Sequence, residues 1–132
     1  MDSNNYNTFV IDGKVNLSGD VKSLINYDEN TVSDYCFYKL FSGCNVIYNI
    51  DELMLTSIKM GKYCYAYMFE NCSNLNGVPK IWMSTLSDSC CEGMFKNCIS
   101  LTKSPELHIY DLEPHCYKEM FYGCNSLNEI NV

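Results

Sequence analysis

The sequence predicts an α/β solenoid of about four coils, each contributing one helix and one short strand. Three observations predict it: a fourfold internal repeat, helical spacing of apolar residues inside each copy, and an apolar stretch after the helix that prolines interrupt. The 132 residues allow one domain, and a hydrophobic content of 47% supplies a packed core. A period of about 20 to 50 residues is typical of repeats that bury their apolar faces against one another. We therefore expect the core to form between stacked coils.

The repeat is defined by two cysteines that stand eight residues apart in every copy. A Leu-Phe or Met-Phe pair lies between them, and Ile or Leu follows three residues after the second cysteine. The first cysteines are separated by 28, 26 and 26 residues, counted directly from their positions. The paired positions are Cys36 and Cys44, Cys64 and Cys72, Cys90 and Cys98, and Cys116 and Cys124.

The segment between the two cysteines has helical spacing. Counted from the first cysteine, apolar residues fall at positions 0, 4, 8 and 11. Ser33 and Ser87 precede two copies as N-caps, and Pro114 suits the first turn of the last. Gly or Asn stands just before each second cysteine, where a left-handed residue would end the helix. These terminators, with positive φ expected at each, are Gly43, Asn71, Asn97 and Gly123.

A short strand is expected after each helix. Leu53, Ile81 and Leu107 are equivalent apolar positions that should point inward. Pro79 and Pro105 lie two residues earlier, and proline cannot donate to a strand ladder. We therefore expect short strands separated by irregular turns.

The combined pattern C-Y-x-x-M-F-x-x-C-x-S-L-x-x-x-P-x-L resembles the Treponema or BspA type of leucine-rich repeat. Such repeats occur in proteins of gut and oral bacteria and of the phages that infect them. The resemblance covers residues 34 to 132 and implies four leucine-rich repeats, the last one truncated. This sequence departs from the pattern at Asp51, which replaces the proline, at Cys91, which replaces the aromatic residue, and near Met60, where two extra residues stand.

Residues 1 to 33 are expected to cap the first coil, since a terminal coil of a solenoid needs a covered apolar face. Residues 9 to 17 are predicted to form a β-hairpin around the favoured two-residue turn Asp12-Gly13. Ser18 would then N-cap a short helix containing Val21 and Leu24.

Charge and targeting signals exclude several classes of protein. The net charge is −7 and no run of Lys or Arg is present, which disfavours binding to nucleic acid. The N-terminal MDSNNYNTF is polar where a signal peptide would be basic and then apolar, and no apolar run of about 20 residues occurs. The chain is expected to be made in the bacterial cytoplasm, without a membrane anchor.

The nine cysteines are expected to be reduced core residues. Eight of them follow the repeat, their spacing does not match a zinc site, and disulfides need an oxidising compartment. A catalytic cysteine would need a histidine nearby, and the two histidines, His108 and His115, stand where other copies carry unrelated residues. No catalytic residue, cofactor or metal ligand is therefore predicted.

A partner-binding row is expected on the outer side of the strands. Met54, Trp82 and His108 occupy the same repeat position, and Tyr110 follows two residues after His108. If their neighbours point inward, this row faces solvent. The alternative is a kinked strand that places Trp82 in the core.

A second partner surface is expected at the last coil. Phe121 and Ile130 continue the core pattern, and Val132 ends the sequence before a cap appears. A second copy of the chain or another virion protein would cover this coil.

These observations predict a non-enzymatic leucine-rich-repeat interaction module. Its repeat and the missing export signal indicate a structural or decoration component of a bacteriophage virion that makes protein–protein contacts. The alternative is an adhesin-like module that binds a bacterial or host cell surface.

Overall fold

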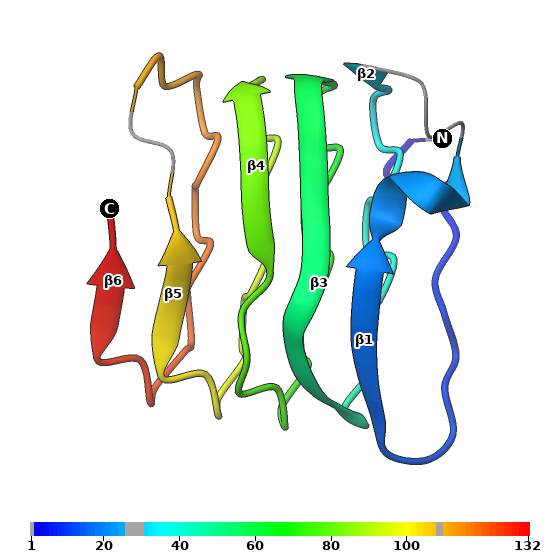
Figure 1. Ribbon diagram of the computed structural model, residues 1–132, viewed down its shortest axis with the longest axis vertical. Coiled ribbons are helices and arrows are strands. Elements are labelled where there is room, and N and C mark those ends of the chain that lie inside the picture. The colour runs from blue at the N-terminus through cyan, green and yellow to red at the C-terminus, as the bar shows by residue number, and fades with distance from the viewer. Residues whose placement is uncertain (1, 26–30, 108–109) are drawn as a thin grey trace.

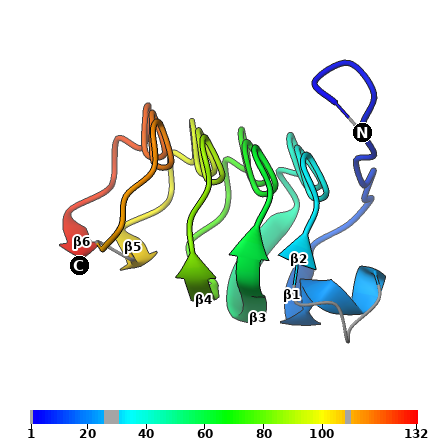
Figure 2. The ribbon, with the colours of Figure 1, turned by 90° about the horizontal axis from the view of Figure 1, so that it is seen from above.

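The computed structural model describes residues 2–25, 31–107 and 110–132 (Figure 1). Successive repeats stack side by side. The strands form one face of the stack and runs of turns form the opposite face (Figure 2). We call these faces the sheet side and the turn side. The N-terminus lies at one end of the stack, and the C-terminus lies at the other end, beside β6.

The strands run parallel. The longest, β3 (Ile47–Met60), pairs with β1 (Val15–Asp20), β2 (Thr31–Val32) and β4 (Lys80–Thr85). A separate two-stranded sheet joins β5 (Lys103–Glu106) to β6 (Glu129–Asn131). In the part of the chain that the structure describes, the only helix is the 3₁₀ helix η1 (Val21–Leu24), and no helix is long and apolar enough to cross a bilayer.

The predicted α/β leucine-rich-repeat solenoid of helix-plus-strand coils is therefore wrong. The segments predicted as helices, residues 34–43, 62–71, 88–97 and 114–123, are runs of consecutive turns. Within each run every fourth residue has positive φ, as at Tyr63 (54°), Tyr67 (55°) and Asn71 (61°). An α-helix keeps all φ values negative, so these segments cannot be helical.

The hydrogen bonds of the turn runs alternate along the chain. The N–H of Met68 donates to the Tyr65 carbonyl three residues back, at 3.3 Å. The next N–H, that of Phe69, donates to the Met94 carbonyl in the following coil, at 2.9 Å. Half of the amides thus close local turns, and the other half join neighbouring coils.

The spacing of apolar residues explains the wrong prediction. Side chains on one face of this turn run recur every four residues, whereas those on a helix recur every 3.6. The two periods are nearly indistinguishable over the eight residues between the cysteines. The positive φ predicted at the four terminators is confirmed, but no helix ends there. The values are 76° at Gly43, 61° at Asn71, 61° at Asn97 and 77° at Gly123.

The core consists of columns of identical side chains that run through the stack. Phe41, Phe69, Phe95 and Phe121 stack with ring centroids 5.5 to 5.9 Å apart and planes within 9° of parallel. The second cysteines form a neighbouring column, in which each Sγ donates to the carbonyl of the phenylalanine one coil earlier. For example, the Cys98 Sγ lies 3.1 Å from the Phe69 carbonyl oxygen.

The N-terminal segment does not form the predicted hairpin. Residues 9 to 14 contain no strand, and β1 pairs with β3 in parallel instead. The short helix does form, as η1, but Asp20 caps it rather than Ser18, through a 2.9 Å bond from the Lys22 N–H. Together β1 and residues 6–9 occupy the layer before the first full coil.

Candidate functional site

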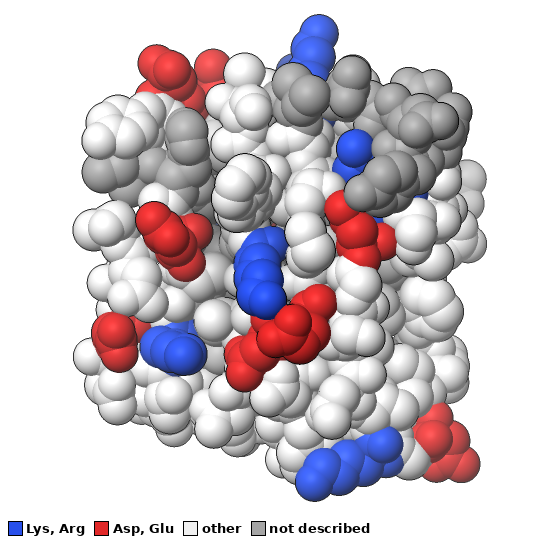
Figure 3. All heavy atoms as spheres, in the orientation of Figure 1, with Lys and Arg blue, Asp and Glu red and all other residues white. Residues whose placement is uncertain are grey.

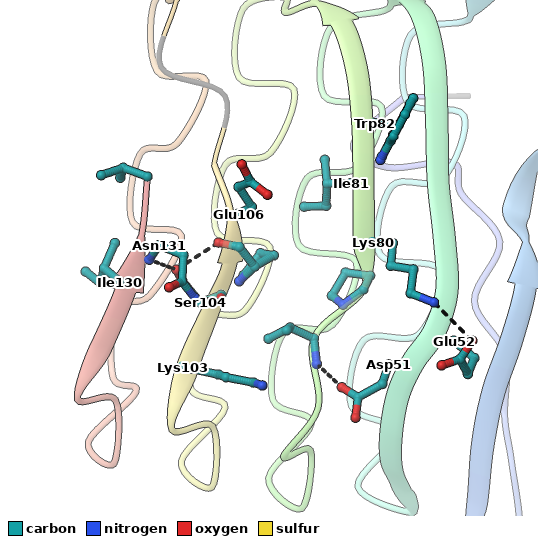
Figure 4. Close-up of a pocket in the computed structure, with 14 residues that line it drawn as sticks. Asp51, Glu52, Lys80, Ile81, Trp82, Lys103, Ser104, Glu106, Ile130 and Asn131 are labelled. Atoms are coloured by element: carbon teal, nitrogen blue, oxygen red, sulfur yellow. Dashed lines mark hydrogen bonds and ion pairs between the residues drawn. The ribbon is translucent and has the colours of Figure 1, made fainter.

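The sheet side contains an open groove between β4 and β5, with a volume of about 770 Å³ (Figure 4). Strand β4 contributes Lys80, Ile81 and Trp82, and strands β5 and β6 contribute Lys103, Glu106 and Ile130. Beside them lie Asp51, Glu52, Asn131 and Val132. The groove thus combines an aromatic ring, aliphatic side chains and charges of both signs.

The groove exists because the sheet divides at this point. Among the described strands, β4 pairs only with β3, and β5 pairs only with β6. Pro105 lies inside β5 and has no N–H to donate. Side chains bridge the register shift between β5 and β6: the Asn131 N–H donates to the Ser104 Oγ at 2.8 Å, and the Asn131 side-chain amide donates to the Ser104 carbonyl at 2.9 Å.

A bulge in β3 shifts the residues that face the groove. The Asn76 N–H donates to the Tyr48 carbonyl, 28 residues earlier, but Met54 pairs with Lys80, only 26 residues later. The two extra residues of this repeat therefore lie between Tyr48 and Met54, and not near Met60 as predicted. Thr56 consequently pairs with Trp82. Met54 and Trp82 do not share a row.

Trp82 is the most exposed aromatic side chain at the groove, with 77% of its surface accessible. It projects from the outer side of β4, where Lys80 is also exposed, while Met83 is buried (Figure 4). The alternative that placed Trp82 in the core is therefore wrong. Together with the exposed Ile130 and Val132, the ring supplies apolar surface that a partner could cover.

Charged residues of both signs lie on the sheet side (Figure 3). The Lys80 Nζ lies 3.1 Å from the Glu52 Oε2, and both side chains are more than half exposed. Such a pair contributes little to stability. Lys103 and Glu106 are also exposed, and no hydrogen bond or ion pair joins either side chain to another described residue. The groove therefore offers donors and acceptors without a large net charge.

The structure brings together only some of the residues predicted to bind partners. Trp82, Ile130 and Val132 line the same groove, although sequence reasoning assigned them to two different surfaces. Met54 is 40% exposed on the far side of Lys80, and Tyr110 is 72% exposed beyond β5. Phe121 lies on the turn side, half-buried against Phe95. His108 lies outside the described residues.

Sequence reasoning missed the polar lining of the groove. The missed residues are polar side chains on the strands, a signal that indicates an exposed face but not a cleft. The cleft depends on the division of the sheet and on the β3 bulge. The missed residues are Asp51, Glu52, Lys80, Lys103, Glu106 and Asn131.

The cysteines are placed for packing. All nine are free thiols, and eight of them are buried. Burial raises the pKa of Cys72 to about 12 and raises the pKa of Cys64 well above its usual value. Because the thiolate is the reactive form, these protonated thiols are poor nucleophiles and poor metal ligands.

Of the two histidines, His115 forms no nucleophile–base pair with a described thiol, and His108 lies outside the described residues. The His115 Nδ1 lies 3.7 Å from the Asp88 Oδ1, on the surface. Within the described ranges, no group of three or more His, Cys, Asp or Glu residues is arranged to hold a metal ion. The arrangement on the sheet side is suited to binding.

Comparisons with protein-family models, with curated proteins and with solved structures found no match for this chain.

Proposed function

We propose that the protein is a non-enzymatic interaction module that binds a partner protein in the groove between β4 and β5. The observation that carries the proposal is Trp82, exposed to 77% and standing over a groove that Ile130 and Val132 also line. Aromatic side chains in such settings dominate binding energy at protein interfaces. The stacked coils give the groove a rigid base, so little ordering is needed on binding.

The partner belongs to a bacteriophage particle in this proposal, with the chain as a structural or decoration component. The resemblance of the repeat to those of phage and gut-bacterial proteins supports this part. Charges of both signs along the groove favour a partner surface of mixed charge over an anionic polymer. The raised pKa values of Cys64 and Cys72 favour the protonated thiols and support a packing role for these two residues.

The test is retention of the chain on purified particles of the phage that encodes it. A Trp82→Ala variant should lose at least about tenfold in retention, because an interface anchor of this kind contributes about 2 kcal/mol or more to binding. Tyr122→Ala is the matched control, because Tyr122 is 63% exposed but lies on the turn side. The control should be retained like the wild type.

Two results would contradict the proposal. Purified phage particles that contain none of this chain would rule out the assignment to the virion. Equal retention of both variants and the wild type would remove the groove as the contact surface. Because Trp82 is the only tryptophan, its emission in the isolated protein also reports the site, and it should be accessible to iodide quenching.

A further inference from the structure

Strand β4 has one edge along which no other strand lies. It pairs in parallel with β3, and no ladder of backbone hydrogen bonds joins it to β5, the fully described strand on the other side of the groove (Figure 4). An unpaired strand edge presents a row of N–H and C=O groups. The β4 wall of the groove therefore offers backbone donors and acceptors as well as side chains.

Strand β5 is poorly suited to pair with this edge. Pro105, inside β5, has no N–H. The Pro105 carbonyl accepts a hydrogen bond from the Ser104 Oγ at 2.8 Å, and the Ser104 carbonyl accepts one from the Asn131 side-chain amide at 2.9 Å. Two successive carbonyls of β5 are thus already bonded to side chains. The space between the strands remains open as the groove of about 770 Å³.

The side chains along β4 suit an extended chain beside it. Lys80 and Trp82 are exposed on the outer face, whereas Ile81, between them, is half-buried against the core. A strand laid along β4 alternates in the same way, because successive side chains point to opposite faces. Its outer side chains would lie beside the Trp82 ring, where aromatic and β-branched residues on adjacent strands stabilise each other. Its inner side chains would contact Ile81.

We infer that the groove receives an extended segment of the partner protein, which adds to the sheet as a strand along the free edge of β4. This inference rests on the proposed function and specifies the form in which the partner binds. The side chains of a folded convex surface can contact Trp82, but they do not supply the regular row of N–H and C=O groups that pairs with a strand edge. An extended backbone supplies that row, and its side chains then give specificity.

The test begins with a selection of displayed random eight-residue peptides on the intact protein. An enriched peptide is synthesised unmodified and in two N-methylated forms, each methylated at alternate residues in one of the two possible phases. One form should bind about tenfold or more weakly, because it lacks the N–H groups that face β4. The other form should bind within about threefold of the unmodified peptide, because its methyl groups face away from β4.

Protein variants and hydrogen exchange complete the test. Trp82→Ala should weaken binding of the unmodified peptide about tenfold or more. Tyr122→Ala is the matched control on the turn side and should bind like the wild type. With the unmodified peptide bound, amides among residues 81–84 should exchange more slowly, since the added strand accepts their hydrogen bonds. Exchange at residues 93–97, on the turn side, should not change.

Two outcomes would overturn the inference. The first is a selection that yields no peptide whose binding depends on Trp82. The second is Trp82-dependent binding that tolerates both N-methylated forms and leaves the β4 amides unprotected, which would mean that the groove binds side chains alone. Retention on phage particles separates these failures from a failure of the proposed function. If Trp82→Ala loses retention, the groove is still the contact surface, and only the added strand is ruled out.

Discussion

The turn side and the sheet side of the stack differ in regularity. On the turn side the phenylalanine rings keep centroid distances of 5.1 to 5.9 Å from Phe9 to Phe121, and the amide ladder continues through every coil. On the sheet side β3 carries a two-residue bulge, the pairing of β5 with β6 shifts register, and β4 does not pair with β5. One regular side is enough to set the spacing of the coils.

The difference teaches where variation is tolerated in this fold. Since the turn side holds the coils together, the sheet side can divide and bulge without loss of the stack. Binding residues concentrate where a rigid scaffold tolerates irregular segments. The groove at Trp82 is such a place, and substitutions on the two sides should therefore differ in their effect on stability.

The largest effect is expected inside the phenylalanine column. Phe69 is fully buried between two rings, so Phe69→Ala should lower the free energy of unfolding by about 3 to 5 kcal/mol. Trp82→Ala, on the sheet side, should change it by no more than about 0.5 kcal/mol. Urea denaturation of both variants measures the contrast. Similar losses in the two variants would break the distinction between the sides.

A second effect is alkaline destabilisation through the buried thiols of the turn side. Burial raises the pKa of Cys72 from 9.0 to about 12, so this contribution to stability is complete below pH 9 and is lost as the pH rises toward 12. Over that window each such thiol should lower the free energy of unfolding by about 1.4 kcal/mol per pH unit. Urea denaturation at a series of pH values measures the slope. Cys72→Ala should make the slope shallower, and an unchanged slope would show that this thiol is not buried.

A third effect comes from the positive φ positions. Gly43→Val should cost about 1 to 2 kcal/mol through the left-handed conformation alone, because nothing lies within 4 Å of an added Cβ. Gly123→Val should cost more, since its Cβ would collide with the Asn97 Oδ1 and that side chain must move. Thermal denaturation compares the two variants. A neutral Gly43→Val variant would argue against left-handed backbone at that turn.

The smallest effect is expected at the division of the sheet. Pro105→Ala supplies an N–H that no strand on the β4 side is placed to accept, so stability should change by no more than about 0.5 kcal/mol. A gain well above that value would mean that the proline alone keeps the sheet divided. Hydrogen exchange at Lys80 and Ile81 would then show new protection.

The repeat, the burial of its cysteines and phenylalanines, and the positive φ at Gly43 and Asn71 were all accessible from the sequence. The helix was not a safe inference, because a four-residue and a 3.6-residue period cannot be separated over so short a segment. The decisive information is φ at Tyr67 and at similar non-glycine residues, for which the sequence carries no signal.

The candidate site was predictable in part. Exposure of Trp82 was one of the two alternatives that the sequence left open, and its partners in the groove depend on the two-residue bulge and on Pro105. Both features change the register between strands and not the conformational preference of single residues. Register is set by pairing between strands that lie far apart in the sequence. Ile130 and Val132 were therefore assigned to a different surface.

The most direct test of the stacked-turn account is the scalar coupling across hydrogen bonds, measured by NMR on uniformly labelled protein. The account predicts a coupling between the Phe69 amide nitrogen and the Met94 carbonyl carbon, because the Phe69 N–H donates to Met94 in the next coil at 2.9 Å. A coupling from Phe69 to the Tyr65 carbonyl, four residues back, would instead show an α-helix and contradict the account.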